Sequence, residues 1–175
     1  MTKPLLTPKY LTKKIAQQAV EVAVYAVLRT APLMHKVKRY HCHIVILVPG
    51  MEDAREADYP DWPNYPLQPV SLYERSIGDM GAWEHQYDNI ARCKALQLWT
   101  DRNDDRTSPI PHLLFSGDTP YWGGVKRRGM VVTCSGVQPW FDKLISGIVA
   151  DTIVALAHDA YENDPEVKQG VDFLS

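Results

Sequence analysis

Residues 123–142 combine features that could bind an anion: glycines at a hairpin, a short apolar strand and the start of a helix. Gly123 and Gly124 relieve the steric limit on backbone conformation, and Ser135 and Gly136 form a bend before the helix. A strand-to-helix corner of this kind directs unpaired N–H groups and the positive end of the helix toward one point. The segment therefore predicts an anion site. An ordinary hairpin followed by a capped helix is the alternative, because short glycine patterns are common.

Two charged residues could complete this site. Lys94 lies among apolar residues on one face of a predicted helix, where its ammonium group could pair with a ligand carboxylate. Its aliphatic chain could equally pack along that face, with the amine in solvent or in a salt bridge. Asp142 falls in the first turn of the last predicted helix, where the helix dipole stabilises a carboxylate in any case, and it could also orient Ser135 or Lys94. No Gly-x-Ser-x-Gly motif surrounds Ser135, so we expect it to form hydrogen bonds rather than act as a nucleophile.

Haem iron accepts a histidine ligand, and the chain has 6 histidines. His85, near the start of the second predicted helix, is the preferred haem ligand, and His112 is the next. His41 and His43 share one face of a predicted strand, but two histidines without a third ligand indicate polar edge residues more than a metal site. The chain contains no His-Glu-x-x-His, Cys-x-x-Cys or Cys-x-x-Cys-His motif, so we expect neither a zincin site nor c-type haem attachment.

Aromatic residues are concentrated around a proline-rich segment and the hairpin. They are Tyr59, Trp62, Tyr65, Tyr73, Trp83, Tyr121 and Trp122. Their flat apolar side chains could enclose a porphyrin or another aromatic ring. Protein interfaces also favour tyrosine and tryptophan, so a contact between subunits is the equal alternative.

The composition argues against a polyanion partner and against a membrane span. The 19 basic and 21 acidic residues leave a net charge of −2, without the basic excess that nucleic-acid binding usually requires. The first residues lack the apolar core of a signal peptide, and no run approaches the ~20 apolar residues that span a bilayer. We therefore expect a soluble, cytoplasmic protein with no nucleic-acid or membrane partner. Its 3 cysteines lie far apart, which favours free thiols over a disulfide framework or a zinc ribbon.

The elements that would position these residues follow from hydrophobic periodicity, and residues 1–175 most simply form one domain. Thr7 and the proline after it predict the start of the first helix. The prolines of residues 49–69 predict an irregular insertion. The last helix is apolar on nearly all sides, so we expect it to be buried under the sheet or in a subunit interface, with a loosely held tail after it. The expected elements are a helix over 8–29, strands over 41–48 and 70–77, a helix over 82–98, a short strand or 3₁₀ turn over 110–115, a hairpin over 121–134 and a helix over 139–161.

This order of elements, with several short motifs, resembles the GlcG/HbpS-like haem-binding and haem-degrading domain family. The motifs are Gly81-Ala82 before a helix, Ala91-x-x-Lys94-Ala95 within it, Gly123-Gly124, Ser135-Gly136 and Asp142. The resemblance implies a profilin-like α+β fold, in which helices flank a mostly antiparallel sheet in three α/β/α layers. It also implies a homo-oligomer, either a dimer or a larger ring, and a role related to haem or to another small molecule. Relatives bind haem or accompany corrinoid, glycolate or aromatic catabolism.

Three functions follow as hypotheses. The first is a protein that binds haem or a related acidic cofactor in a pocket bounded by Lys94, the Gly123-Gly124 hairpin and the Ser135-Gly136 bend, with residues 49–69 as a lid. The second is an enzyme acting on a small carboxylated metabolite, in which Lys94 and the hairpin amides stabilise negative charge on oxygen. This enzyme hypothesis is favoured somewhat because the insertion and Val125-Lys126 depart from the family pattern beside the pocket. The third is a non-catalytic assembly or sensor module whose partner binds the proline-rich loop.

Overall fold

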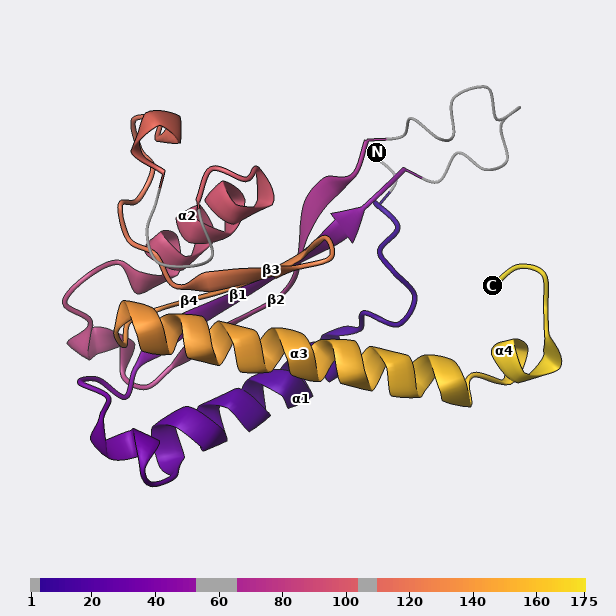
Figure 1. Cartoon of the computed structure of the whole chain (residues 1–175), viewed down its shortest axis with the longest axis horizontal. Helices are drawn as coiled ribbons and strands as arrows, with labels where there is room; N and C mark the ends of the chain where they lie inside the picture. Colours follow the sequence, from indigo (N-terminus) through magenta and orange to yellow (C-terminus); the bar gives the residue numbers. More distant parts are fainter. Residues whose placement is uncertain (1–3, 53–65, 104–109) are drawn as a thin grey trace.

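A computed structural model describes residues 4–52, 66–103 and 110–175 (Figure 1). At its centre lies a sheet with the strand order β2-β1-β4-β3. The strands are β1 (Cys42–Gly50), β2 (Gln68–Ile77), β3 (Gly124–Arg127) and β4 (Met130–Ser135). Each pair of neighbouring strands is antiparallel. β1 and β4 are central strands with nearly every residue buried, which explains why their sequences are almost continuously apolar.

Helices cover both faces of this sheet. α1 (Lys13–Val24) and α3 (Pro139–Asn163) lie side by side on one face, and α2 (Tyr87–Trp99) lies on the other (Figure 1). Alternate residues of β1 point to opposite sides, so that Ile44 packs in the core under α1 and α3, whereas Val45 packs in the core under α2. This arrangement confirms the expected α+β fold with three α/β/α layers and an antiparallel sheet.

The first helix starts later than the sequence pattern predicts. Thr12, not Thr7, is its N-cap, and the Thr12 hydroxyl accepts a hydrogen bond of 3.2 Å from an amide of the first turn. Leu6 instead pairs with Met51 across a β-bridge, with N–O distances of 2.8 and 2.9 Å. The chain before α1 is therefore extended beside the end of β1. After α1 the helix continues as a π-helical turn over Tyr25–Arg29.

Residues 49–50 and 68–69, at the two ends of the proline-rich segment, are strand rather than loop. Pro49 and Gly50, which begin the predicted irregular insertion, pair with Pro69 and Gln68 at the end of the β1–β2 ladder. Prolines are tolerated there because β2 is an edge strand and both prolines lie near strand ends. Residues 53–65, which include the rest of the predicted lid and three of its aromatic residues, lie outside the described residues.

The second helix also begins late. The predicted start at Ala82 belongs to a 3₁₀ turn, Met80–Ala82, whereas α2 begins at Tyr87. An aspartate side chain caps the 3₁₀ turn by accepting a hydrogen bond of 2.9 Å from the Gly81 amide. Pro111–Leu113 adopts the 3₁₀ alternative predicted for that region. The predicted hairpin is confirmed as β3 and β4.

α3 confirms the helix expected from Pro139, but only part of its surface is buried. Ile145 lies in the core, whereas Trp140 and Val154 are 56% and 52% exposed. The tail is not loosely held, because it forms a further short helix, α4 (Pro165–Gln169). Among the described helices, none has the length and apolar character needed to cross a membrane.

Candidate functional site

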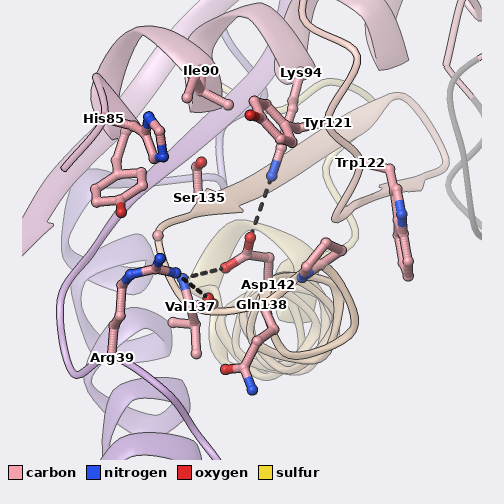
Figure 2. A pocket seen from close by; sticks show the side chains of 13 residues that line it. Arg39, His85, Ile90, Lys94, Tyr121, Trp122, Ser135, Val137, Gln138 and Asp142 are labelled. Atoms are coloured by element: carbon pink, nitrogen blue, oxygen red, sulfur yellow. Dashed lines mark hydrogen bonds and ion pairs between the residues drawn. The ribbon is translucent and has the colours of Figure 1, made fainter. Parts of the chain in front are cut away.

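A pocket of about 180 Å³ lies where α2, the end of β4 and the start of α3 meet (Figure 2). Lys94, Ser135, Gly136 and Asp142, all predicted from the sequence, contribute to its wall. His85, the preferred haem ligand in the sequence analysis, also lines the pocket and is exposed. The structure therefore brings together segments that are far apart in the chain, as the predicted anion site requires.

A buried ion pair forms one wall of the pocket. Figure 2 shows Lys94 pointing from α2 toward Asp142, with 3.3 Å between Lys94 Nζ and Asp142 Oδ2. Lys94 Nζ also donates a hydrogen bond of 2.9 Å to the Cys134 carbonyl oxygen. Lys94 and Asp142 are only 1% and 4% exposed. The small residues Ala91 and Ala95 let α2 approach the sheet closely, which places the lysine between α2 and β4. The solvated amine, one alternative for Lys94, is therefore wrong, and the salt bridge is confirmed.

Asp142 has an unusual electrostatic environment. Burial raises the pKa of its carboxyl group above the ordinary aspartate value, although Lys94 and the Val137 amide act in the opposite direction. The Val137 amide donates a hydrogen bond of 3.1 Å to Asp142 Oδ1. Asp142 lies in the first turn of α3, as the sequence predicts. The carboxyl group can therefore retain a proton at a pH at which an exposed aspartate would have lost it.

The glycines of the predicted site allow close packing rather than lining the pocket with amides. Gly123 has φ +120°, and a Cβ atom there would lie 2.7 Å from Asp142 Cβ and 2.9 Å from the Pro139 carbonyl oxygen. Gly136 has φ +132°, and a Cβ atom there would be crowded by backbone atoms of His41 and of Cys42, the first residue of β1. Gly124 packs against α2 and β4. Of these three, only Gly136 lines the pocket, so the prediction that Gly123 and Gly124 bound it directly is wrong.

The other predicted histidines do not join the site. His112 is exposed in its 3₁₀ turn and does not line the pocket. His43 is not at a sheet edge but buried on the central strand β1, where its ring nitrogens lie 2.9 Å from Ser76 Oγ and 3.1 Å from Glu74 Oε2. Within the described ranges, no three His, Cys, Asp or Glu residues are grouped so that they could hold a metal ion.

A haem group does not fit this pocket. Pockets for drug-sized ligands measure about 300–1,000 Å³, and a porphyrin belongs to that size class or above it. The volume of about 180 Å³ is smaller than this range. His85, which would have to coordinate the iron, lies at the exposed side of the pocket. The site geometry thus favours a ligand much smaller than haem.

Arg39 lines the pocket, although no pattern in the sequence pointed to it. Its guanidinium group donates a hydrogen bond of 3.2 Å to the Val137 carbonyl oxygen (Figure 2). It also forms an ion pair of 3.0 Å with Glu84. Arg39 is separated from Val137 by 98 positions in the chain, so periodicity and spacing cannot reveal their contact. Tyr121 and Trp122, singled out only as part of an aromatic group, complete the wall.

Two cationic side chains, Arg39 and Lys94, line the pocket. Each is paired with a carboxylate, Arg39 with Glu84 and Lys94 with Asp142. Gln138, the N-cap residue of α3, turns its side chain away to bond Lys38 N at 2.9 Å and Lys36 O at 3.2 Å. Its side chain therefore does not cap α3, and the positive end of this helix of 25 residues faces the same region. Such an arrangement can hold a small anion.

Comparisons of the chain with protein-family models, with curated proteins and with solved structures found no match. The resemblance to the GlcG/HbpS-like family therefore stays a prediction that rests on the quoted motifs.

Proposed function

We propose that this protein binds a small carboxylate in the pocket between α2 and the start of α3. The observation that carries the proposal is the presence of two cationic side chains, Arg39 and Lys94, in the pocket wall beside the N-terminal end of α3. Low dielectric surroundings strengthen the attraction between such cations and a ligand anion. Hydrogen bonds to charged groups are also stronger than those between neutral groups.

The size and lining of the pocket narrow the class of ligand. A cavity of about 150 Å³ in another protein holds one benzene molecule. The pocket of about 180 Å³ is therefore suited to a carboxylate with a single ring or a short chain. Tyr121 and Trp122 provide flat apolar surface for such a group. We therefore favour this ligand class over haem, which the family resemblance implied.

Benzoate is expected to bind and to raise the Tm of the full chain by about 5–10 °C at roughly 100 times its Kd. Benzamide has the same shape without the charge and should produce little shift. Arg39→Gln should weaken benzoate binding about tenfold or more, because it removes a charged donor from the pocket. Calorimetric titration measures these affinities directly.

Arg128→Gln is the matched control, because Arg128 is exposed at the tip of the β3–β4 hairpin and does not line the pocket. Equal benzoate affinity in the parent and in Arg39→Gln would contradict the proposal. Hemin is titrated in the same series. A saturable Soret shift without benzoate binding would return haem to first place.

An enzyme that acts on the same carboxylate is the second candidate. It is favoured by Asp142, because burial raises the pKa of this carboxyl group, as is typical of residues that transfer protons. If Asp142→Asn loses turnover of a carboxylate that it still binds, the protein is an enzyme rather than a binding protein.

We also propose that the protein forms a homo-oligomer. The exposed apolar side chains of Trp140 and Val154 on α3 support this proposal, and sedimentation velocity measures the oligomeric state.

A further inference from the structure

Tyr87, the first residue of α2, carries a polar group with no partner in the described chain. The residue is 4% exposed and lines the pocket. Its hydroxyl oxygen is buried and makes no hydrogen bond to any described residue. Nearly all buried polar side-chain atoms in proteins have a hydrogen-bond partner, and leaving one unpaired costs free energy. The Tyr87 hydroxyl therefore indicates a partner that is not part of the described structure.

Two neighbouring side chains share this feature. His41 Nε2 and Trp83 Nε1 are also buried without a hydrogen-bond partner among the described residues. The His41 and Trp83 rings lie 5.6 and 5.5 Å from the Tyr87 ring, measured between centroids. The Trp83 nitrogen can only donate a hydrogen bond, and the Tyr87 hydroxyl can donate or accept. Three buried polar atoms without a partner among the described residues are thus grouped around the Tyr87 ring, and Tyr87 is the one of these three residues that lines the pocket.

The Tyr87 hydroxyl keeps the proton that it needs to act as a donor. Burial raises the pKa of its hydroxyl group above the ordinary tyrosine value, so the proton is retained at neutral pH. Arg39 and Lys94 carry cationic donor groups, which are suited to a carboxylate. A neutral hydroxyl donor is suited to a second oxygen atom, such as that of a hydroxyl or carbonyl group.

We propose that Tyr87 donates a hydrogen bond to a second oxygen on the ligand, which makes the ligand class a hydroxy- or oxo-substituted carboxylate. This inference rests on the proposed function, because Arg39 and Lys94 must hold the carboxylate for Tyr87 to meet the other oxygen. It identifies Tyr87 as a residue that determines specificity. A site that hydrogen-bonds a substituent discriminates strongly against the analogue that lacks it, since its buried polar group is then left unpaired.

The test compares benzoate with 3- and 4-hydroxybenzoate by calorimetric titration of the full chain. The parent should bind the better of the two hydroxybenzoates about tenfold more tightly than benzoate. Tyr87→Phe should keep the affinity for benzoate within about twofold and lose the preference for the hydroxyl. Tyr121→Phe is the matched control, because Tyr121 lines the same pocket but is 49% exposed, and it should retain the preference.

A measurement without ligand separates this idea from a purely structural role. If the hydroxyl has no partner in the free protein, Tyr87→Phe should leave the Tm unchanged or slightly raised. A decrease of about 2–4 °C would reveal an internal partner, such as a buried water, and would overturn the inference.

The outcomes also separate the two proposals. Benzoate binding that depends on Arg39, with the same hydroxyl preference in the parent and in Tyr87→Phe, overturns the role of Tyr87 alone. Binding of benzoate and both hydroxybenzoates with equal affinity by the parent has the same consequence. If none of these carboxylates binds the parent, the proposed function fails, and the role of Tyr87 fails with it.

Discussion

Lys94→Met is expected to lower the free energy of unfolding by about 3–5 kcal/mol, because the Asp142 carboxylate would remain buried without its cation. Methionine keeps the length and apolar character of the lysine side chain, so the loss isolates the ammonium group. The Cys134 carbonyl oxygen would lose its donor at the same time. Urea unfolding of both proteins at neutral pH measures the difference.

A surface pair provides the matched control for Lys94→Met. Lys126 Nζ lies 2.9 Å from Asp101 Oδ1, but the two side chains are 32% and 81% exposed. Lys126→Met should therefore cost no more than about 1 kcal/mol, as solvent screens an exposed pair. If Lys94→Met and Lys126→Met lower the free energy of unfolding equally, the buried pair between Lys94 and Asp142 is not the source of the stability.

A double substitution identifies the cause of the loss. Asp142→Asn keeps an oxygen that can accept the Val137 amide hydrogen bond while it removes the charge. In the Lys94→Met/Asp142→Asn protein no charge is left buried, so its loss should be smaller than the sum of the two single losses by about 1–3 kcal/mol. Additive losses would mean that the two side chains act independently.

The cost of Lys94→Met should also depend on pH. Burial raises the pKa of Asp142 in the folded protein, so between its unfolded and folded pKa values the folded state binds more protons than the unfolded state. Asp142 therefore reduces stability as the pH rises through that window. Lys94 opposes this rise in the pKa, and its removal should enlarge the effect. We expect the difference between parent and variant to be largest at neutral pH and to shrink as the pH falls toward 4.

Gly123→Ala is expected to destabilise the protein by about 3 kcal/mol or more, through two effects that act together. Its φ of +120° is unfavourable for a residue with a side chain. The added Cβ would also lie 2.9 Å from the Pro139 carbonyl oxygen and 2.7 Å from Asp142 Cβ, so the first turn of α3 would have to move. Because that turn forms a wall of the pocket, benzoate affinity should fall as well.

Gly117→Ala separates the two effects. Gly117 has φ +94°, and a Cβ atom there would meet nothing within 4 Å among the described residues. Its substitution should cost only the backbone strain, about 1–3 kcal/mol, and should leave benzoate binding unchanged. If Gly123→Ala and Gly117→Ala have the same stability and the same affinity, crowding against α3 plays no part. Denaturant unfolding and calorimetric titration provide both readouts.

Local patterns were sufficient to predict most elements of the fold. A run of β-branched residues correctly indicated β1, the strand predicted over 70–77 is β2, and the proline at Pro139 marked the start of α3. The same reasoning failed where pairing with a distant segment sets the first or last residue of a helix or strand. The bridge between Leu6 and Met51 holds the chain extended and moves the first cap to Thr12. These boundaries depend on pairing between distant segments, which periodicity does not contain.

The candidate site could likewise be predicted only in part from the sequence. Lys94 and Asp142 could be found in advance, because a lysine on an apolar helix face and an acid in the first turn of a helix are local signals. The ion pair between Lys94 and Asp142 joins residues 48 positions apart, and the hydrogen bond between Arg39 and Val137 joins residues 98 positions apart. Both contacts form only when α2, β4 and α3 pack together. Tyr87 carries no local signal, since its importance lies in a hydroxyl group that packing buries without a partner. Side-chain type and periodicity thus determine which face of an element is buried, whereas tertiary packing decides which polar groups meet and which remain unpaired.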